Sequence, residues 1–167
     1  IVNFNFSDDT TGLTIDLLTG SAETGIWSGI EEAGGRFGSG DDDVTAGAQL
    51  EDLYGGAGGD KLTLDYSGPL PDGRTVDRIR LDPDDGTAED DKIYVGGTGI
   101  KGPRLDDFER YDITATDGDD DVSLYSVLGD SAVYGLGGND ALSGGDGDDI
   151  LDGGAGNDVF RGRDGAD

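Results

Sequence analysis

The chain has 167 residues, which fits one domain or two small ones, and its 38 acidic residues against 11 basic ones give a formal net charge of −27 at pH 7. This charge would repel nucleic-acid phosphates, and no apolar run is long enough to span a bilayer, so we expect no nucleic-acid partner and no transmembrane span. The absence of Cys and His excludes disulfides and thiolate metal sites and removes the usual general base, so we predict that the chain is not an enzyme.

Strand-like stretches, several with alternating polar and apolar residues, occur in both halves of the chain. They lie roughly at 1–6, 12–18, 25–32, 75–81, 91–96 and 107–114. The chain has 33 glycines and far more Asp than Glu, a composition that favours turns over helices. We therefore predict an all-β protein without significant helix.

A nine-residue phrase recurs between and after these stretches. From Gly135 onwards the chain reads GLGGNDALS, GGDGDDILD, GGAGNDVFR and then GRDGAD. Glycine is concentrated at positions 1–4, Asp stands at position 6 and a large apolar residue stands at position 8. Related nonapeptides occupy 37–63 in the first half, and the second set covers 115–167. Repeats of this kind indicate a solenoid.

The two sets of nonapeptides suggest that one plan occurs twice. The phrase Gly40-Asp41-Asp42-Asp43-Val44 returns 78 residues later as Gly118-Asp119-Asp120-Asp121-Val122. We therefore predict two tandem copies of a strand-plus-nonapeptide unit, at 1–67 and 68–167, with the second continuing beyond the end of the chain. Together they are expected to form one continuous solenoid.

The spacing within a nonapeptide predicts how successive repeats stack. A short strand carries one inward side chain, at position 8, and the glycine-rich residues before it reverse the chain. Alternate nonapeptides then fall on opposite sheets, so one coil takes eighteen residues, and the acids at position 7, such as Asp43 and Asp121, face outward. The expected inward neighbours are Val44 with Leu62, Val122 with Leu142 and Phe160, and Val133 with Leu151.

The same stacking brings the position-6 carboxylates together. Asp42 is expected beside Asp60, Asp140 beside Asp158, and Asp149 beside Asp167. Carboxylates at the strand spacing of about 4.8 Å repel one another, so a cation must lie between successive coils. The available donors are all hard oxygens, and Ca²⁺ binds 6–8 such oxygens in a flexible geometry. The sequence therefore predicts several bound calcium ions.

The phrases GGDGDDILD and GGAGNDVFR resemble the RTX (repeats-in-toxin) nonapeptide G-G-x-G-x-D-x-U-x. The resemblance implies a right-handed parallel β-roll, a β-helix solenoid with calcium between its turns, within a large secreted bacterial protein. It further implies export through a type I secretion channel to the extracellular space or the cell surface. Such a chain is unfolded inside the cell, where calcium is scarce, and folds outside.

The resemblance also assigns calcium ligands. They are the carboxylates of Asp42, Asp60, Asp120, Asp140, Asp149, Asp158 and Asp167, and the carbonyls of Gly135, Gly144, Asp146, Gly153 and Ala155. Ser131 and Glu51 occupy position 6 in two nonapeptides, where we expect weak or absent sites. The insertion Leu124-Tyr125 stretches the Asp120–Asp140 spacing to twenty residues and leaves that site open.

Three functions are compatible with these features. The first is a calcium-binding RTX module that folds outside the cell and supports the secretion and stability of the rest of its polypeptide. The second is an adhesive segment of an RTX adhesin or surface protein that binds extracellular polysaccharide through outward aromatic residues. The third is a non-catalytic module of a secreted enzyme whose active site lies outside this chain.

Overall fold

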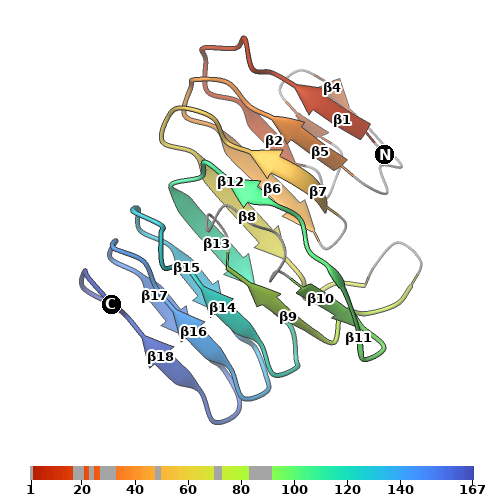
Figure 1. Ribbon diagram of the computed structural model, residues 1–167, viewed down its shortest axis with the longest axis vertical. Coiled ribbons are helices and arrows are strands. Elements are labelled where there is room, and N and C mark those ends of the chain that lie inside the picture. Colours follow the sequence, from red (N-terminus) through yellow and green to blue (C-terminus); the bar gives the residue numbers. More distant parts are fainter. Residues whose placement is uncertain are drawn as a thin grey trace.

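The computed structural model describes residues 2–16, 21–22, 25–26, 33–47, 50–69, 73–82 and 92–167. Across these ranges the regular elements are all β-strands, arranged in three sheets (Figure 1). The predicted all-β class is therefore confirmed. In the same ranges, no helix is long and apolar enough to cross a membrane.

The largest sheet has eight strands in the order β17-β15-β13-β8-β6-β2-β3-β4. From β17 to β2 each strand is parallel to the next. The remaining two pairs, β2 with β3 and β3 with β4, are antiparallel. Their bounds are β2 (Thr14–Asp16), β3 (Ser21–Ala22), β4 (Gly25–Ile26), β6 (Asp43–Gly47), β8 (Lys61–Asp65), β13 (Arg110–Thr114), β15 (Ala132–Tyr134) and β17 (Ile150–Asp152).

Two further sheets receive the strands that alternate with these. The six-stranded sheet contains β11 (Thr98–Lys101), β10 (Lys92–Val95), β9 (Arg78–Leu81), β14 (Asp121–Ser123), β16 (Ala141–Ser143) and β18 (Val159–Arg161). The four-stranded sheet contains β1 (Val2–Asn5), β5 (Ala33–Arg36), β7 (Leu50–Tyr54) and β12 (Leu105–Asp106). Among the described strands of these two sheets, the antiparallel pairs are β9 with β10 and β10 with β11.

The chain winds between the sheets as a parallel β-roll. From β5 to β8 it alternates between the four-stranded and the eight-stranded sheet, and from β12 to β18 each strand lies in a different sheet from the one before it. Strands from consecutive nonapeptides therefore belong to facing sheets, and every second nonapeptide pairs in parallel, as the repeat spacing predicts. The antiparallel strands β3, β4, β10 and β11 lie outside the nonapeptides.

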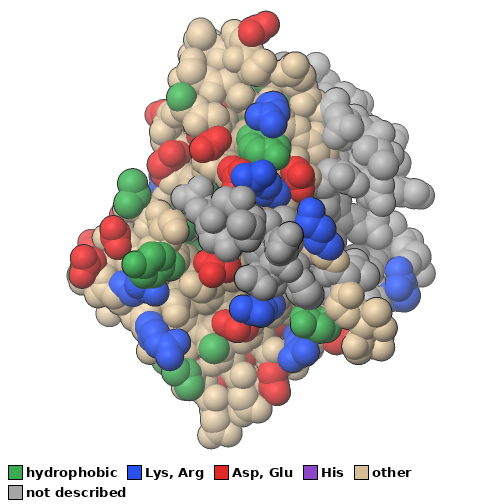
Figure 2. Space-filling model, in the orientation of Figure 1, with side chains coloured by type: hydrophobic (Ala, Val, Ile, Leu, Met, Phe, Trp, Pro, Cys, Tyr) green, Lys and Arg blue, Asp and Glu red, His purple; other side chains and the backbone are tan. Residues whose placement is uncertain are grey.

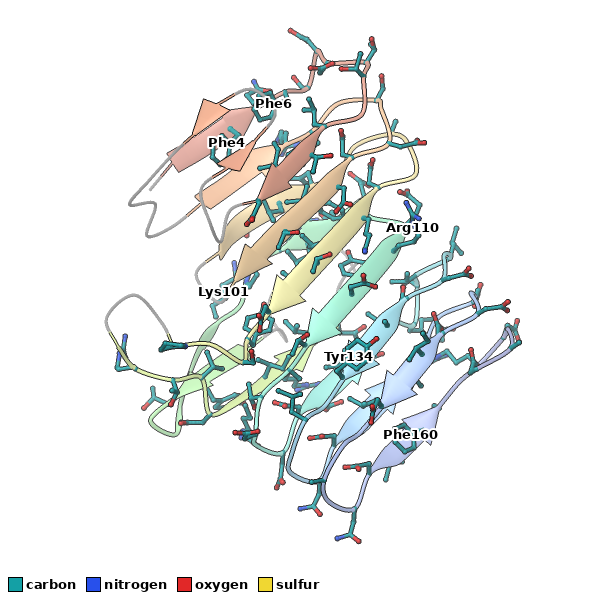
Figure 3. All side chains as sticks on the ribbon, turned by 180° about the vertical axis from the view of Figure 1, so that it is seen from behind. Phe4, Phe6, Lys101, Arg110, Tyr134 and Phe160 are labelled. Atoms are coloured by element: carbon teal, nitrogen blue, oxygen red, sulfur yellow. The ribbon has the colours of Figure 1, made fainter. Side chains whose placement is uncertain are left out.

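The inward side chains stack in the predicted register. Val44 pairs with Leu62, Val122 with Leu142, and Val133 with Leu151. Val44, Leu62, Val122 and Val133 are fully buried in a continuous apolar core. Leu142 also pairs with Phe160, as predicted. Phe160 lies in the edge strand β18 (Figure 3), where its side chain is 49% exposed. Asp43 and Asp121 are exposed, as expected for position 7.

The core is thicker in the middle of the roll than in its C-terminal coils. Strands β6, β8 and β13 have five residues each, and each buries two inward side chains, such as Leu62 and Leu64 in β8. A row of aromatic rings also runs across successive coils, from Phe6 to Phe37 and Phe108. In contrast, the three-residue strands after residue 120 carry a single central inward residue, so apolar burial per coil is smaller there.

The two copies of the repeated phrase enter different sheets. Val44 lies in β6 of the eight-stranded sheet, whereas Val122 lies in β14 of the six-stranded sheet. Strands of the two predicted units also pair directly, since β8 lies beside β13 and β7 beside β12. The division at residues 67 and 68 stays a prediction. The predicted strand residues 1, 17–18, 27–32 and 91 lie outside the described residues.

Candidate metal centre

Residues just before the strands of the eight-stranded sheet form a column of side-chain to backbone hydrogen bonds. Asp42 Oδ1 accepts the Leu13 N–H at 2.8 Å, and Asp60 Oδ1 accepts the Asp42 N–H at 2.8 Å. Glu109 Oε2 then accepts the Asp60 N–H at 2.6 Å. Each carboxylate thus binds the backbone of the neighbouring coil.

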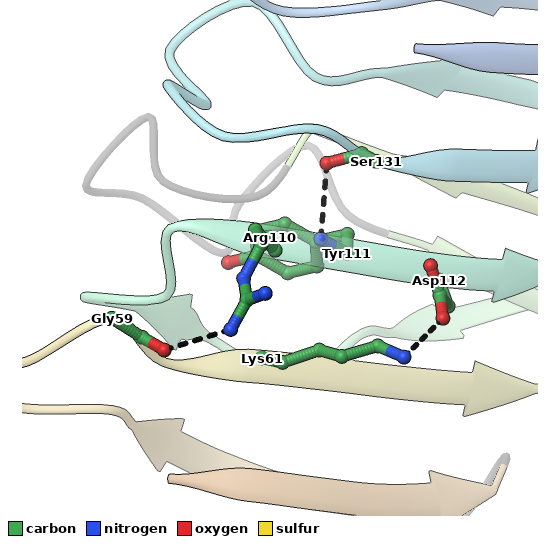
Figure 4. Close-up of polar contacts among 6 residues, drawn as sticks. All are labelled: Gly59, Lys61, Arg110, Tyr111, Asp112 and Ser131. Carbon is green, nitrogen blue, oxygen red and sulfur yellow. Dashed lines mark hydrogen bonds and ion pairs between the residues drawn. The ribbon is translucent and has the colours of Figure 1, made fainter. Parts of the chain in front are cut away.

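The column continues through the C-terminal coils. Ser131 Oγ accepts the Tyr111 N–H at 3.1 Å (Figure 4), and Asp149 Oδ1 accepts the Ser131 N–H at 2.9 Å. Asp167 Oδ1 accepts the Asp149 N–H at 3.0 Å. Ser131 therefore keeps the hydrogen bond but brings no charge to the coil where we expect a weak calcium site. We call the set Asp42, Asp60, Glu109, Ser131, Asp149 and Asp167 the first column.

A second column follows the six-stranded sheet and consists of Asp120, Asp140 and Asp158. Asp120 Oδ1 accepts the Ile79 N–H at 2.5 Å, Asp140 Oδ1 accepts the Asp120 N–H at 2.8 Å, and Asp158 Oδ1 accepts the Asp140 N–H at 3.0 Å. The insertion leaves the Asp120–Asp140 contact in place. Its two residues are accommodated with Leu124 buried in the core and Tyr125 61% exposed.

Five of the position-6 carboxylates are buried, so keeping them charged in the folded protein costs free energy. Asp60 is 0% and Asp140 is 1% exposed, and Asp42, Asp120 and Asp149 are almost equally buried. Burial raises the pKa of Asp60 and of Asp120 to about 6, and nearby acids add to the effect. The pKa values of Asp42, Asp140 and Asp149 are raised for the same main reason. Such carboxylates need a compensating positive charge.

Several of these buried oxygens lack a hydrogen-bond partner among the described residues. They are the Oδ2 atoms of Asp42, Asp60 and Asp140. At Gly135, an added Cβ would overlap Asp140 Oδ2 and would stand 2.9 Å from the Gly153 carbonyl oxygen. At Gly144 it would overlap Asp149 Oδ2 and stand 2.7 Å from the Gly162 carbonyl oxygen. A carboxylate oxygen and a carbonyl oxygen of the next coil therefore converge beside each of these glycines.

These donors fit a calcium ion. Within the described ranges, no group of three or more acidic side chains converges closely enough to hold a metal. The carboxylates instead come in stacked pairs, and backbone carbonyls lie beside them. Mixed carboxylate and carbonyl oxygens are the ligands that Ca²⁺ takes in proteins, and the buried, unpartnered oxygens supply the negative charge.

The other predicted ligands lie in the same turns with different exposure. Asp158 is half-buried and Asp167 is exposed. The carbonyl of Ala155 accepts the Gly138 N–H at 2.9 Å, and the N–H of Asp146 donates to the Val127 carbonyl at 2.9 Å. The position-3 residues therefore take part in coil-to-coil hydrogen bonds, and their role as ligands stays a prediction. The side chain of Glu51 lies outside the described residues.

Position 5 forms a further, exposed set of contacts that the sequence analysis did not assign. Asp41 Oδ1 accepts the Gly59 N–H at 2.9 Å, and Asp119 Oδ1 accepts the Asn139 N–H at 2.7 Å. The hydrogen bonds from Asn139 lower the pKa of Asp119. Asp130 and Asp148 accept N–H groups from the next coil in the same way. The recurrence of Asp and Asn at position 5 was the available signal.

Glu109 is a further residue of the site that the sequence did not identify. It stands two residues before the buried Tyr111, as Asp60 stands before Leu62. Glycines are absent from the residues immediately before it, so the nonapeptide pattern does not identify it. The available signal was an acidic residue two positions before a large inward one.

Comparison with known families agrees with this geometry. Residues 134–167 match the family model of the RTX calcium-binding nonapeptide repeat, in four copies. This C-terminal segment therefore matches the same calcium-binding repeat that its sequence resembles. No curated protein matches the chain. Outside the matched residues, Asp42 and Asp60 make the same type of coil-to-coil contact as Asp140 and Asp158.

The raised pKa values of Asp60 and Asp120 predict how the stability of the calcium-free protein depends on pH. Because their folded-state pKa of about 6 exceeds the ordinary aspartate value of 3.8, the folded state binds more protons than the unfolded state between these two pH values. The folded calcium-free protein is therefore favoured below pH 4 and loses that advantage as the pH rises through 6. Circular dichroism of the metal-free protein checks this, at pH values from about 3.5 to about 7.5 that bracket the two pKa values. A folded fraction that increases with pH would contradict it.

Proposed function

We propose that this chain is a calcium-dependent folding module of a secreted protein. The observation that carries the proposal is the set of buried position-6 carboxylates that stack from coil to coil, three of which (Asp42, Asp60 and Asp140) have an Oδ2 atom without a hydrogen-bond partner among the described residues. Because these oxygens are brought together only in the folded chain, the free energy of calcium binding contributes to folding. Calcium thereby links the C-terminal coils, whose apolar burial is small.

The same physics supports a role in secretion and stability. The net charge of −27 opposes compaction of the chain unless cations neutralise part of it. In the calcium-poor interior of a cell the chain stays unfolded and fits a narrow export channel, and it folds on meeting calcium outside. RTX repeats are typical of secreted bacterial proteins, in agreement with this location for residues 134–167.

Far-UV circular dichroism tests the proposal directly. In chelator at pH 7 the spectrum is expected to be that of a largely disordered chain, and millimolar calcium, on the order of extracellular site affinities, is expected to restore a β spectrum. Magnesium at the same concentration serves as the control, because it prefers a strict octahedron and retains its waters. A β spectrum that stays unchanged from chelator to calcium would rule the proposal out.

The polysaccharide-binding alternative depends on outward aromatic rings. Figure 2 shows basic side chains beside hydrophobic ones on one face of the molecule. The Arg36 guanidinium lies 4.0 Å from the centre of the Tyr54 ring, and Arg78 and Arg163 stack on Tyr94 and Tyr125 at 4.1 and 4.0 Å. These contacts cover ring faces that a sugar would need. A glycan array probed in calcium tests the alternative, and specific binding would support it.

We propose further that this segment has no catalytic activity of its own. Its acidic residues at position 6 are engaged in coil-to-coil contacts, and the chain has no His or Cys. If the segment belongs to an enzyme, the activity is expected from the full-length parent and not from the segment assayed alone.

A further inference from the structure

The repeat is interrupted between β8 and β13. After β8 the chain leaves the regular coil at Tyr66 and resumes it with β12 and β13. Even so, β8 and β13 pair in parallel over five registered residues, from Lys61 with Arg110 to Asp65 with Thr114. The coil that lies beside Asp60 is therefore built from Asp107, Phe108 and Glu109 and not from a nonapeptide. No repeat motif assigns a metal site to this junction.

The junction nevertheless has the hydrogen-bond geometry of a regular pair of coils. The Asp60 N–H donates to Glu109 Oε2 at 2.6 Å, just as the Asp140 N–H donates to Asp158 Oδ1 at 3.0 Å. Glu109 thus takes the place that a position-6 Asp holds elsewhere. Two acidic side chains from distant parts of the sequence are stacked here as they are within the repeats.

The backbone beside Asp60 also matches a regular site. An added Cβ at Gly55 would overlap the carbonyl oxygen of Asp107 and would lie 2.9 Å from Asp60 Oδ2. At Gly135 the corresponding neighbours are the Gly153 carbonyl and Asp140 Oδ2, so the Asp107 carbonyl corresponds to the Gly153 carbonyl. Asp107 has a φ of 61°, in the left-handed region. Glycine favours this region and other residues enter it at a cost.

Asp60 supplies an independent indication of a ligand. Its side chain is 0% exposed, and its Oδ2 atom has no hydrogen-bond partner in the described part of the chain. The charges that act on its carboxyl group come from Asp42, Glu109 and Asp41, which are all acidic. A buried carboxylate oxygen in this setting requires a cation.

The two basic residues at the junction have other partners. Arg110 Nη2 donates to the Gly59 carbonyl at 3.0 Å, and Lys61 forms an ion pair with Asp112 (Figure 4). Arg110 is exposed and Lys61 is partly exposed. These contacts join β13 to β8 and to the turn before it through partly or fully exposed side chains, whereas Asp60 Oδ2 is buried.

We propose that a calcium ion binds at this junction between Asp60 Oδ2, the Asp107 carbonyl oxygen and the Glu109 carboxylate. This inference rests on the proposed function, because it adds a site to the same calcium-binding stack. The ion would join the coils of the first half to those of the second half across the interruption. The number of calcium ions then exceeds by one the number that the nonapeptides alone provide.

Native mass spectrometry of the full chain in calcium measures that number. Glu109→Gln keeps an oxygen that accepts the Asp60 N–H but removes the charge, so it is expected to bind one calcium ion fewer than the wild type. Asp43→Asn makes the same change of charge at an exposed position on β6 and is expected to bind the wild-type number. A Glu109→Gln protein that folds and binds the wild-type number would overturn the inference.

Crystals of the wild type grown with calcium give an independent readout if Glu109→Gln does not fold. The inference predicts an anomalous difference peak about 2.3–2.6 Å from both Asp60 Oδ2 and a Glu109 carboxylate oxygen. Peaks in the second column without one at the junction would overturn the inference and leave the proposed function standing. A folded wild type that binds no calcium at all would overturn the proposed function as well.

Discussion

Replacing Asp140 with Asn is expected to change stability in opposite directions with and without calcium. Asp140 is 1% exposed, and its Oδ2 atom lies near the Gly153 carbonyl with no hydrogen-bond partner among the residues that the structure describes. Without calcium, Asn removes a buried charge close to Asp158, so the variant is expected to be more stable than the wild type. With calcium, the loss of a charged ligand is expected to raise the calcium midpoint of folding at least about tenfold, or about 1.4 kcal/mol.

Asp121→Asn is the matched control for this variant. It makes the same change of charge, but Asp121 is exposed and its ion pair with Arg80, at 3.7 Å, involves two exposed side chains. Such a pair contributes little to stability. Calcium titrations of both variants, followed by far-UV circular dichroism, give the comparison. Equal midpoint shifts in the two variants would mean that the effect is one of net charge and not of the site.

Gly156→Ala is expected to destabilise the calcium-bound protein strongly. Gly156 stands at position 4, where every nonapeptide but the one at 46–54 has glycine. Its φ is 147°, and an added Cβ would overlap the carbonyl oxygen of Gly138 in the coil below. The methyl group can enter only if two stacked backbones separate, so we expect a loss of about 3 kcal/mol or more.

Gly73→Ala separates the steric effect from the backbone effect. Gly73 also has a positive φ, of 82°, but no atom of the described residues, chain neighbours aside, lies within 4 Å of the position of an added Cβ. The expected loss is therefore limited to the backbone strain of about 1–2 kcal/mol. Urea unfolding of both variants in saturating calcium measures the difference. If Gly156→Ala unfolds at the same urea concentration as Gly73→Ala, close packing of the coils at position 4 does not limit stability.

The regular part of the roll could be predicted from spacing alone. In a nonapeptide, Asp at position 6 and a large apolar residue at position 8 repeat at fixed distances, so stacking one coil on the next fixes both partners. The pairs Val44–Leu62 and Asp140–Asp158 are therefore found where the sequence places them. The two-residue insertion before Ser126 does not disturb this stacking, because the added residues lengthen the connection between β14 and β15.

The junction could not be predicted in this way. β8 pairs with β13, although the whole chain between Asp65 and Arg110 separates them in sequence. No periodic pattern specifies which segment lies beside Asp60. Glu109 lacks the glycines that mark a nonapeptide, so its role follows only from the three-dimensional register. The antiparallel strands β10 and β11 arise in the same excursion, where pairing is local and does not follow the repeat.

The contacts at position 5 could not be predicted from the sequence for a different reason. Its Asp and Asn residues recur visibly, but exposed acids in turns are ordinarily solvated, and the sequence does not indicate that Asp119 binds the Asn139 N–H of the next coil. The coil that supplies the hydrogen-bond acceptor also differs between positions 5 and 6. At position 5 the earlier coil supplies the acceptor, whereas at position 6 the later coil supplies it. The two contacts together fasten each turn to the next from both sides.

Anomalous diffraction from calcium-grown crystals tests the central claim that calcium lies between the coils. We expect one peak beside Asp140 Oδ2 and the Gly153 carbonyl oxygen, and another beside Asp149 Oδ2 and the Gly162 carbonyl oxygen, at the points where these oxygens converge. A folded protein whose peaks lie only at exposed acids such as Asp119, with none along either column, would contradict it.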